Sequence, residues 1–189
     1  PRRARELRPD LVLATDLEQP ALLGALRAEG VRCLALPCES WTQLLQAARE
    51  IGTACGVAER AAAWSASMQG RRQRLAAEQD AFFRARPRPR LYIEVWGDPV
   101  LTAGRDTMLN DLAELAGARP LGASLPGRYP AVSLEWVLRG DPDLILVAYP
   151  GEAGAAVRRL KRRPGWETIQ AVRDNAICDF IDPDWLARP

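Results

Sequence analysis

The chain has 189 residues, enough for one large domain or two small ones. Lys and Arg total 26 against 24 Asp and Glu, and this net charge of +2 argues against a nucleic-acid partner, which usually requires a concentrated basic face. Histidine is absent, which removes the usual general base and the commonest metal ligand. No signal peptide is recognised, and no apolar run reaches the ~18–20 residues that a membrane-spanning helix needs.

The first part of the chain alternates short apolar runs with helical patterns. Residues 11–14 and 31–36 are predicted strands, and 18–29 and 41–51 are predicted helices, the second of which should end at Gly52. Strands that alternate with helices favour an α/β fold with a parallel sheet.

A long helix is predicted next, over residues 57–86. The segment is rich in Ala, Arg, Gln, Glu and Leu, and Pro87 and Pro89 follow it. At 1.5 Å per residue this helix is a rod of roughly 45 Å. It is either a coiled-coil arm or a spine that joins two lobes, and the poor heptad pattern favours the spine.

The last part of the chain returns to the α/β pattern. Its predicted strands are 91–96, 144–148 and 176–181, and its predicted helices are 107–116, 134–138, 152–163 and 166–172. Asp106 is expected to cap the first of these helices and Ser133 the second.

A short phrase occurs near both ends of the chain. Arg8-Pro9-Asp10-Leu11-Val12-Leu13-Ala14 is echoed by Asp141-Pro142-Asp143-Leu144-Ile145-Leu146-Val147, and each copy opens an apolar run. Such a repeat indicates two similar lobes, and two lobes imply a cleft, which is a common place for a small ligand.

Aromatic and charged residues fall on loops at plausible sheet ends. In a parallel sheet, ligands bind beyond the carboxyl ends of the strands. Aromatic faces there suit a large, flat, partly apolar ligand, while Asp and Arg can hydrogen-bond its rim. The candidate ligand-binding residues are Trp96, Tyr129, Asp184, Trp185 and Arg188.

Nucleotide chemistry and metal binding have little support. The segment 14–18 that follows the first strand has no glycine and two acids, which would repel phosphate. The cysteines form no C-x-x-C pair, so a zinc site is not indicated, and a bond among Cys33, Cys38 and Cys55 stays open.

Several motifs together resemble a known family. They are Val95-Trp96-Gly97-Asp98-Pro99, Thr102-Ala103-Gly104, Tyr129-Pro130-Ala131-Val132-Ser133-x-Glu135 and Asp141-Pro142-Asp143-Leu144-Ile145. With the duplicated phrase and the long helix, they resemble the cobalamin-type substrate-binding proteins of ABC importers, in the group that binds vitamin B12, iron-siderophores and haem.

The resemblance implies a class III periplasmic binding protein-like fold. Two α/β lobes with parallel-type sheets would be joined by one long spine helix. The partial N-terminal lobe would cover residues 1–56, the spine helix 57–88 and the C-terminal lobe 89–189. Relatives of this type have an earlier part of the first lobe before the region matched here, and a final helix after it.

The resemblance also implies residue roles. Trp96 and Tyr129 match aromatics that line a corrin pocket, Asp184 and Arg188 match polar residues that contact the ligand, and Trp185 lies between them. Glu135 matches the acidic knob of the second lobe, which docks onto arginines of the permease. The corresponding acid of the first lobe is replaced by Arg2, so docking by two knobs is not expected.

The expected function is binding and not catalysis. The protein would capture cobalamin or a related corrinoid in the cleft, as a transported ligand and not a cofactor. It would deliver the ligand to ABC permease subunits, in peripheral contact with the membrane complex, and it would work in the periplasm or another extracytoplasmic space. The alternatives are an iron-siderophore or haem carrier of the same group, and a doubly wound enzyme that uses a nucleotide.

Overall fold

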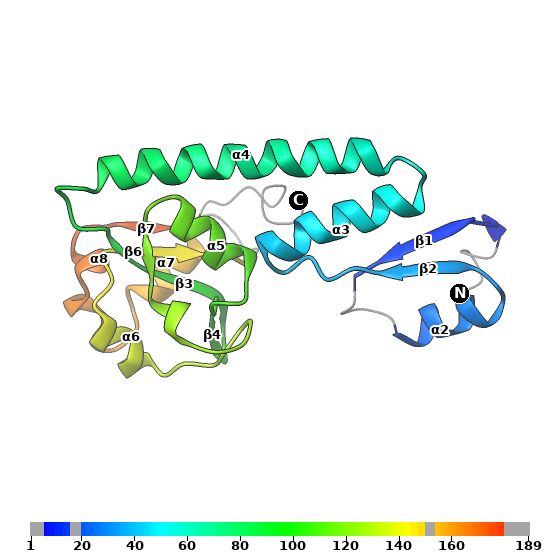
Figure 1. Cartoon of the computed structure of the whole chain (residues 1–189). Coiled ribbons are helices and arrows are strands. Elements are labelled where there is room, and N and C mark those ends of the chain that lie inside the picture. Colours follow the sequence, from blue (N-terminus) through cyan, green and yellow to red (C-terminus); the bar gives the residue numbers. More distant parts are fainter. Residues whose placement is uncertain (1–5, 16–19, 150–153, 180–189) are drawn as a thin grey trace. The chain divides into compact units, whose positions relative to one another are not determined.

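The computed structural model describes residues 6–15, 20–149 and 154–179. The chain divides into two compact units, residues 1–71 and 72–189, each described by itself below. Both combine strands with helices, so the predicted α/β class is confirmed (Figure 1). Within the described ranges, no helix combines the length and the apolarity needed to cross a membrane.

The first unit contains a two-stranded parallel sheet. Strand β1 (Leu11–Ala14) pairs with β2 (Arg32–Ala35), and Val12 lies opposite Cys33. Helix α2 (Pro20–Ala28) connects the two strands, as the βαβ pattern predicts. Cys33 and Cys55 are free thiols, so no disulfide joins these two residues.

Helix α3 (Trp41–Ala54) runs past the residue that was expected to end it. Ser40 caps its start by accepting the Gln43 N–H, but Gly52 lies inside the helix. A Cβ on Gly52 would come 2.2 Å from the Ala61 Cβ, so glycine here permits a close approach of two helices. The chain leaves the helical conformation at Gly56 instead, where φ is +71°.

The predicted long helix is present as α4 (Ala58–Phe82). It is continuous across the boundary between the two units, which falls between Arg71 and Arg72. It ends at Phe82, ahead of Pro87 and Pro89. A proline has no backbone N–H to donate to the preceding turn, so the helix cannot continue through these positions. The division into lobes at 1–56, 57–88 and 89–189 stays a prediction.

The second unit is built on a five-stranded sheet. Strand β3 (Arg90–Gly97) lies between β6 (Leu144–Val147), which pairs with it in parallel, and two short strands on its other edge. Of these, β5 (Arg119–Pro120) pairs along the start of β3, and β4 (Val100–Thr102) pairs antiparallel along its end. Strand β7 (Ile177–Cys178) is parallel to β6. The hairpin partner β4 is not among the predicted strands.

Helices cover both faces of this sheet (Figure 1). The face that carries Tyr92 packs against residues of five helical segments, and the face that carries Leu91 and Ile93 packs against residues of one helix, 108–115. The elements are α5 (Met108–Leu115), η1 (Leu121–Ser124), α6 (Leu134–Gly140), α7 (Ala155–Leu160), η2 (Trp166–Thr168) and α8 (Gln170–Arg173). The helix predicted at 166–172 is therefore two pieces, interrupted by extended backbone at Ile169.

The repeated sequence phrase adopts the same backbone conformation in both copies. Arg8 and Asp141, each directly before a proline, have positive φ values of 46° and 37°. The last four residues of each copy form a strand, β1 in one unit and β6 in the other. The left-handed residue ends the preceding helical turn and the proline prevents its continuation, so the same Pro-Asp-Leu sequence begins both strands.

Candidate functional site

Trp96 lies at the carboxyl end of β3, where the sequence predicts a ligand-facing aromatic. Its side chain is 51% exposed, and its indole Nε1–H donates to the Asp98 carbonyl at 2.8 Å. The indole is thus oriented by the turn that follows β3, and half of its surface is open to solvent. This arrangement fits a binding residue better than a core residue.

Tyr149 lies beside Trp96 and was missed in the sequence. It follows β6, the parallel neighbour of β3, so both residues lie at the carboxyl ends of the strands, on the same end of the sheet. Their ring centroids are 6.0 Å apart and their planes meet at 59°, within the range of favourable aromatic pairs. The rule that ligands bind beyond strand ends would have identified Tyr149, because it stands two residues past β6.

A buried carboxylate lies behind this aromatic pair. Glu94 is fully buried and accepts a hydrogen bond from the Tyr149 hydroxyl at 2.8 Å and one from the Tyr92 hydroxyl at 3.1 Å. Arg163 forms an ion pair with both oxygens of the same carboxylate. Burial first, and the Glu94 carboxylate second, raise the pKa of Tyr92 and of Tyr149.

Arg159 adds a positive charge on the open side of Tyr149. Its side chain is exposed, its guanidinium donates to the Tyr149 hydroxyl, and its Cζ lies 5.4 Å from the ring centroid. Since Arg163 already neutralises Glu94, these three charged side chains leave a net positive charge beside the aromatic pair.

Tyr129 is 45% exposed on a segment that is tied to the same edge. The Thr102 N–H donates to the Pro130 carbonyl at 3.1 Å, and Leu101 pairs both with Trp96 and with Ala131. The backbone thus brings the segments of Trp96 and Tyr129 to one end of the sheet.

Glycines let the Tyr129 segment approach closely. A Cβ on Gly104 would come 2.2 Å from the Gly127 carbonyl oxygen. The expected cap at Asp106 is wrong: Thr107 caps α5 by accepting the Asn110 N–H, and the Asp106 carboxylate instead accepts the Gly127 N–H at 3.2 Å. Asp106 therefore stabilises the loop that carries Tyr129.

Glu135 is exposed in the first turn of α6. Ser133 caps this helix, as predicted, and its Oγ accepts the Trp136 N–H at 3.1 Å. Hydrogen bonds from the Glu135 backbone N–H and from Ser133 hold the pKa of the Glu135 carboxyl below its ordinary value. Glu135 is therefore a surface carboxylate that stays charged at neutral pH.

The other candidate residues, Asp184, Trp185 and Arg188, lie outside the described residues. Among the residues that the structure describes, no group of three or more acidic or cysteine side chains could hold a metal ion.

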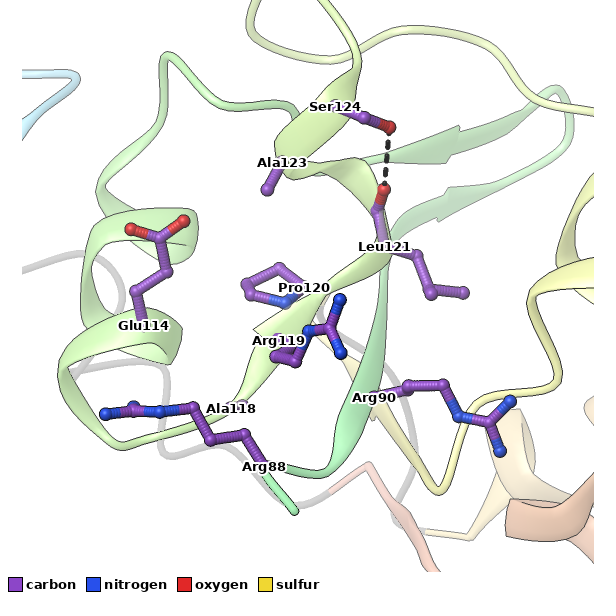
Figure 2. Close-up of a pocket in the computed structure, with 9 residues that line it drawn as sticks. All are labelled: Arg88, Arg90, Glu114, Ala118, Arg119, Pro120, Leu121, Ala123 and Ser124. Atoms are coloured by element: carbon purple, nitrogen blue, oxygen red, sulfur yellow. Dashed lines mark hydrogen bonds between the residues drawn. The ribbon is translucent and has the colours of Figure 1, made fainter. Parts of the chain in front are cut away.

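A hollow of about 630 Å³ lies at the opposite end of the sheet, by the start of β3 (Figure 2). Three arginines line it, but Arg90 is bound to Asp143 at 2.9 Å and Arg88 to Asp80 at 2.6 Å. Pro120 lies between Arg119 and Glu114 in this view. Ligands of parallel sheets bind at the carboxyl ends of the strands, so we assign the site to the edge with Trp96 and Tyr149.

The fold is that of known solute-binding proteins. A possible iron-binding protein of Staphylococcus epidermidis superposes with a TM-score of 0.84 at 22% identity, over 100% of this chain and 73% of that one. The vitamin B12 binding protein BtuF of Vibrio cholerae gives 0.71 at 21%, over 100% and 71%. A periplasmic haem-binding protein of Pseudomonas aeruginosa gives 0.79 at 29%, over 93% and 65%. The predicted class III fold is thus confirmed.

Sequence comparison agrees with the fold. The chain is 26% identical over 187 residues to the uncharacterised ABC transporter substrate-binding lipoprotein YvrC of Bacillus subtilis, and it spans 57% of the length of that protein. The family model of the periplasmic binding proteins matches residues 5–182. This chain therefore belongs to the periplasmic binding protein family, whose members bind solutes and are not enzymes.

Proposed function

We propose that this protein is the ligand-binding component of an ABC importer and that it captures a tetrapyrrole, in the first place cobalamin or a related corrinoid. The observation that carries the proposal is the pairing of Trp96 with Tyr149 at the carboxyl ends of two adjacent parallel strands. The half-exposed Trp96 ring and the partly buried Tyr149 ring together offer apolar area to a broad, flat ligand. The membership of the family and the relative named for an ABC transporter support the importer.

Further contacts would come from the segments around this pair. Tyr129 is half-exposed at the same end of the sheet and would extend the apolar surface. The ligand roles of Asp184, Trp185 and Arg188 stay predictions from the resemblance. Amides on the rim of a corrin ring can accept from Arg and donate to Asp, which is why such residues suit this ligand.

Haem, or an anionic iron-siderophore, is the second candidate. Arg159 places a solvent-exposed guanidinium beside the aromatic pair, and guanidinium groups bind carboxylates in bidentate geometry. The propionate groups of haem would match this charge, whereas the amides of cobalamin do not need it. The haem-binding relative of P. aeruginosa, at 29% identity, supports the same candidate.

Delivery to the permease would use Glu135. Its carboxylate is exposed and charged, and it lies on α6, an element that carries neither Trp96 nor Tyr149. A charged knob of this kind orients a partner and speeds association. Glu135→Gln should leave ligand titrations unchanged and slow ligand-stimulated ATP hydrolysis by the cognate permease in proteoliposomes. An unchanged ATPase rate would remove Glu135 from the docking surface.

Ligand titration tests the proposal directly. Cyanocobalamin, haemin and a ferric siderophore are titrated into the chain by calorimetry and by visible absorption. Trp96→Ala should weaken binding of the preferred ligand by about tenfold, a loss of about 1.4 kcal/mol. The control is Trp64→Ala, which removes a comparably exposed indole (43%) from α4. The proposal fails if none of the three probes binds, or if the two variants behave alike.

A further inference from the structure

One charged pair of the second unit is out of place in an apolar core. The Glu94 side chain is 0% exposed and the Arg163 side chain 10% exposed. They lie on the face of the sheet that packs Tyr92, Val147 and Trp166. A buried ion pair contributes little net stability, because the desolvation of two charges offsets their attraction. Some role other than stability therefore has to explain it.

The hydrogen bonds of Glu94 indicate that role. An ionised carboxylate has about four acceptor positions, and Glu94 receives four donors: two N–H groups of Arg163 and the hydroxyls of Tyr92 and Tyr149. A neutral or apolar side chain at this position could not hold all four. Arg163 is itself fixed, because its Cζ lies 4.5 Å from the centre of the Trp166 ring.

The pair is connected directly to the proposed binding surface. Tyr92 and Glu94 lie two residues apart on one face of β3. After an irregularity in the pairing with β4, Trp96 follows and contacts Tyr149, which is bound to Glu94. Tyr149 is bound through its hydroxyl to Glu94 on the buried side and to Arg159 on the exposed side. The phenol therefore has a single supported orientation, and its ring meets Trp96 at a defined angle.

We infer that Glu94, neutralised by Arg163, is a positioning residue: it anchors the Tyr149 hydroxyl and thereby holds the aromatic surface formed with Trp96 in its binding geometry. The inference rests on the proposed function. Its physical basis is preorganisation, since a side chain that is already ordered loses less conformational entropy when a ligand binds.

A paired apolar replacement separates positioning from stability. In the double variant Glu94→Leu with Arg163→Met, both charges are removed together, which usually leaves a core as stable as before. Methionine can keep the contact with the Trp166 ring. We expect the double variant to fold and to melt below the natural protein, because the buried Tyr92 hydroxyl loses its acceptor. Whichever probe the chain prefers, cyanocobalamin or haemin, should bind about tenfold more weakly. Binding at full strength in a folded double variant would overturn the inference. If the double variant does not fold, Glu94→Gln takes its place.

A mutant cycle shows whether the effect passes through Tyr149. Tyr149→Phe removes only the anchored hydroxyl and should weaken binding to a similar extent. When Tyr149→Phe is added to the Glu94→Leu, Arg163→Met variant, the affinity should not fall further, because both changes break the hydrogen bond between Tyr149 and Glu94. Losses that multiply would contradict the inference. The matched control is Asp143→Asn, which alters the other carboxylate–arginine pair of β3 and should not change affinity.

A measurement without ligand distinguishes failure of this inference from failure of the proposed function. The chain contains three tyrosines, so ¹⁹F NMR of 3-fluorotyrosine-labelled protein gives few signals, and Tyr149→Phe assigns one of them. The Glu94 variant should shift or broaden the Tyr149 signal, and Asp143→Asn should not. If no probe binds but this shift appears, the positioning holds and the ligand proposal fails. An unmoved Tyr149 signal rejects the positioning.

Discussion

Strand β3 has an arginine–carboxylate pair at each end, and the two pairs differ in environment. At its start, Arg90 and Asp143 have side chains that are 39% and 37% exposed. Toward its end, Arg163 and Glu94 are 10% and 0% exposed. The first pair links two strands at the surface, while the second lies under the proposed binding surface. An arginine–carboxylate pair thus connects two strands at one end of β3 and, by our inference, positions Tyr149 at the other.

The largest expected effect is the loss of the buried cation. Arg163→Ala leaves the Glu94 charge uncompensated in the core, which should lower the free energy of unfolding by about 3–5 kcal/mol. Urea denaturation followed by circular dichroism measures this change. The control is Arg162→Ala, an exposed neighbour whose loss should lie within about 0.5 kcal/mol of zero. Equal losses in the two variants would mean that burial does not distinguish Arg163.

The exposed pair should contribute much less. Asp143→Asn should cost no more than about 1 kcal/mol, because solvent screens the charges and the amide oxygen can still accept the Arg90 backbone N–H. In 1 M salt, roughly the concentration at which charges are screened within ~3 Å, the two proteins should converge. A loss as large as that of Arg163→Ala would contradict the comparison between the two ends.

Acid should act on the exposed pair in a defined direction. The hydrogen bonds and charge of Arg90 lower the pKa of Asp143 in the folded protein. The stabilisation is therefore fully present above the pKa that Asp143 has in the unfolded chain, and it is lost as the pH falls through the lower folded pKa. The stability difference between the natural protein and Asp143→Asn should vanish over this acidic range. If the difference in free energy of unfolding between the two proteins grew on acidification, the pKa of Asp143 would not be lowered in the folded protein.

The smallest expected effect concerns a glycine beside the buried pair. A Cβ on Gly97 would lie 3.3 Å from the Tyr149 hydroxyl oxygen, closer than most such contacts. Gly97→Ala should therefore displace the phenol slightly and weaken ligand binding by about threefold, on the order of 0.6 kcal/mol. At the other end, Gly140→Ala would meet the Leu121 side chain and should reduce stability without changing affinity. Calorimetric titration of both variants checks this contrast.

Local sequence patterns predicted most helices and strands, but not all of the residues at which they begin and end. The strands at β1, β3 and β6 and the helix α4 follow from apolar runs and helix-forming residues. The end of α3 was misplaced, because Gly52 serves the approach of Ala61 and not a helix terminus. Strand β4 was missed because three residues are too few for an alternating pattern to be recognised.

The sequence by itself determined the α/β class, the repeated strand-opening phrase, the long helix and the position of Trp96 at a strand end. Each of these features depends on residues that are close together in the sequence, because hydrophobic periodicity and turn-forming residues act locally. The pairing of Trp96 with Tyr149 and the burial of Glu94 against Arg163 were decided only by the tertiary structure. Glu94 stands 55 positions from Tyr149 and 69 from Arg163. The order of the strands, with β6 beside β3, brings Tyr149 to Glu94. The segment between α7 and η2, which packs on the same face of the sheet, brings Arg163.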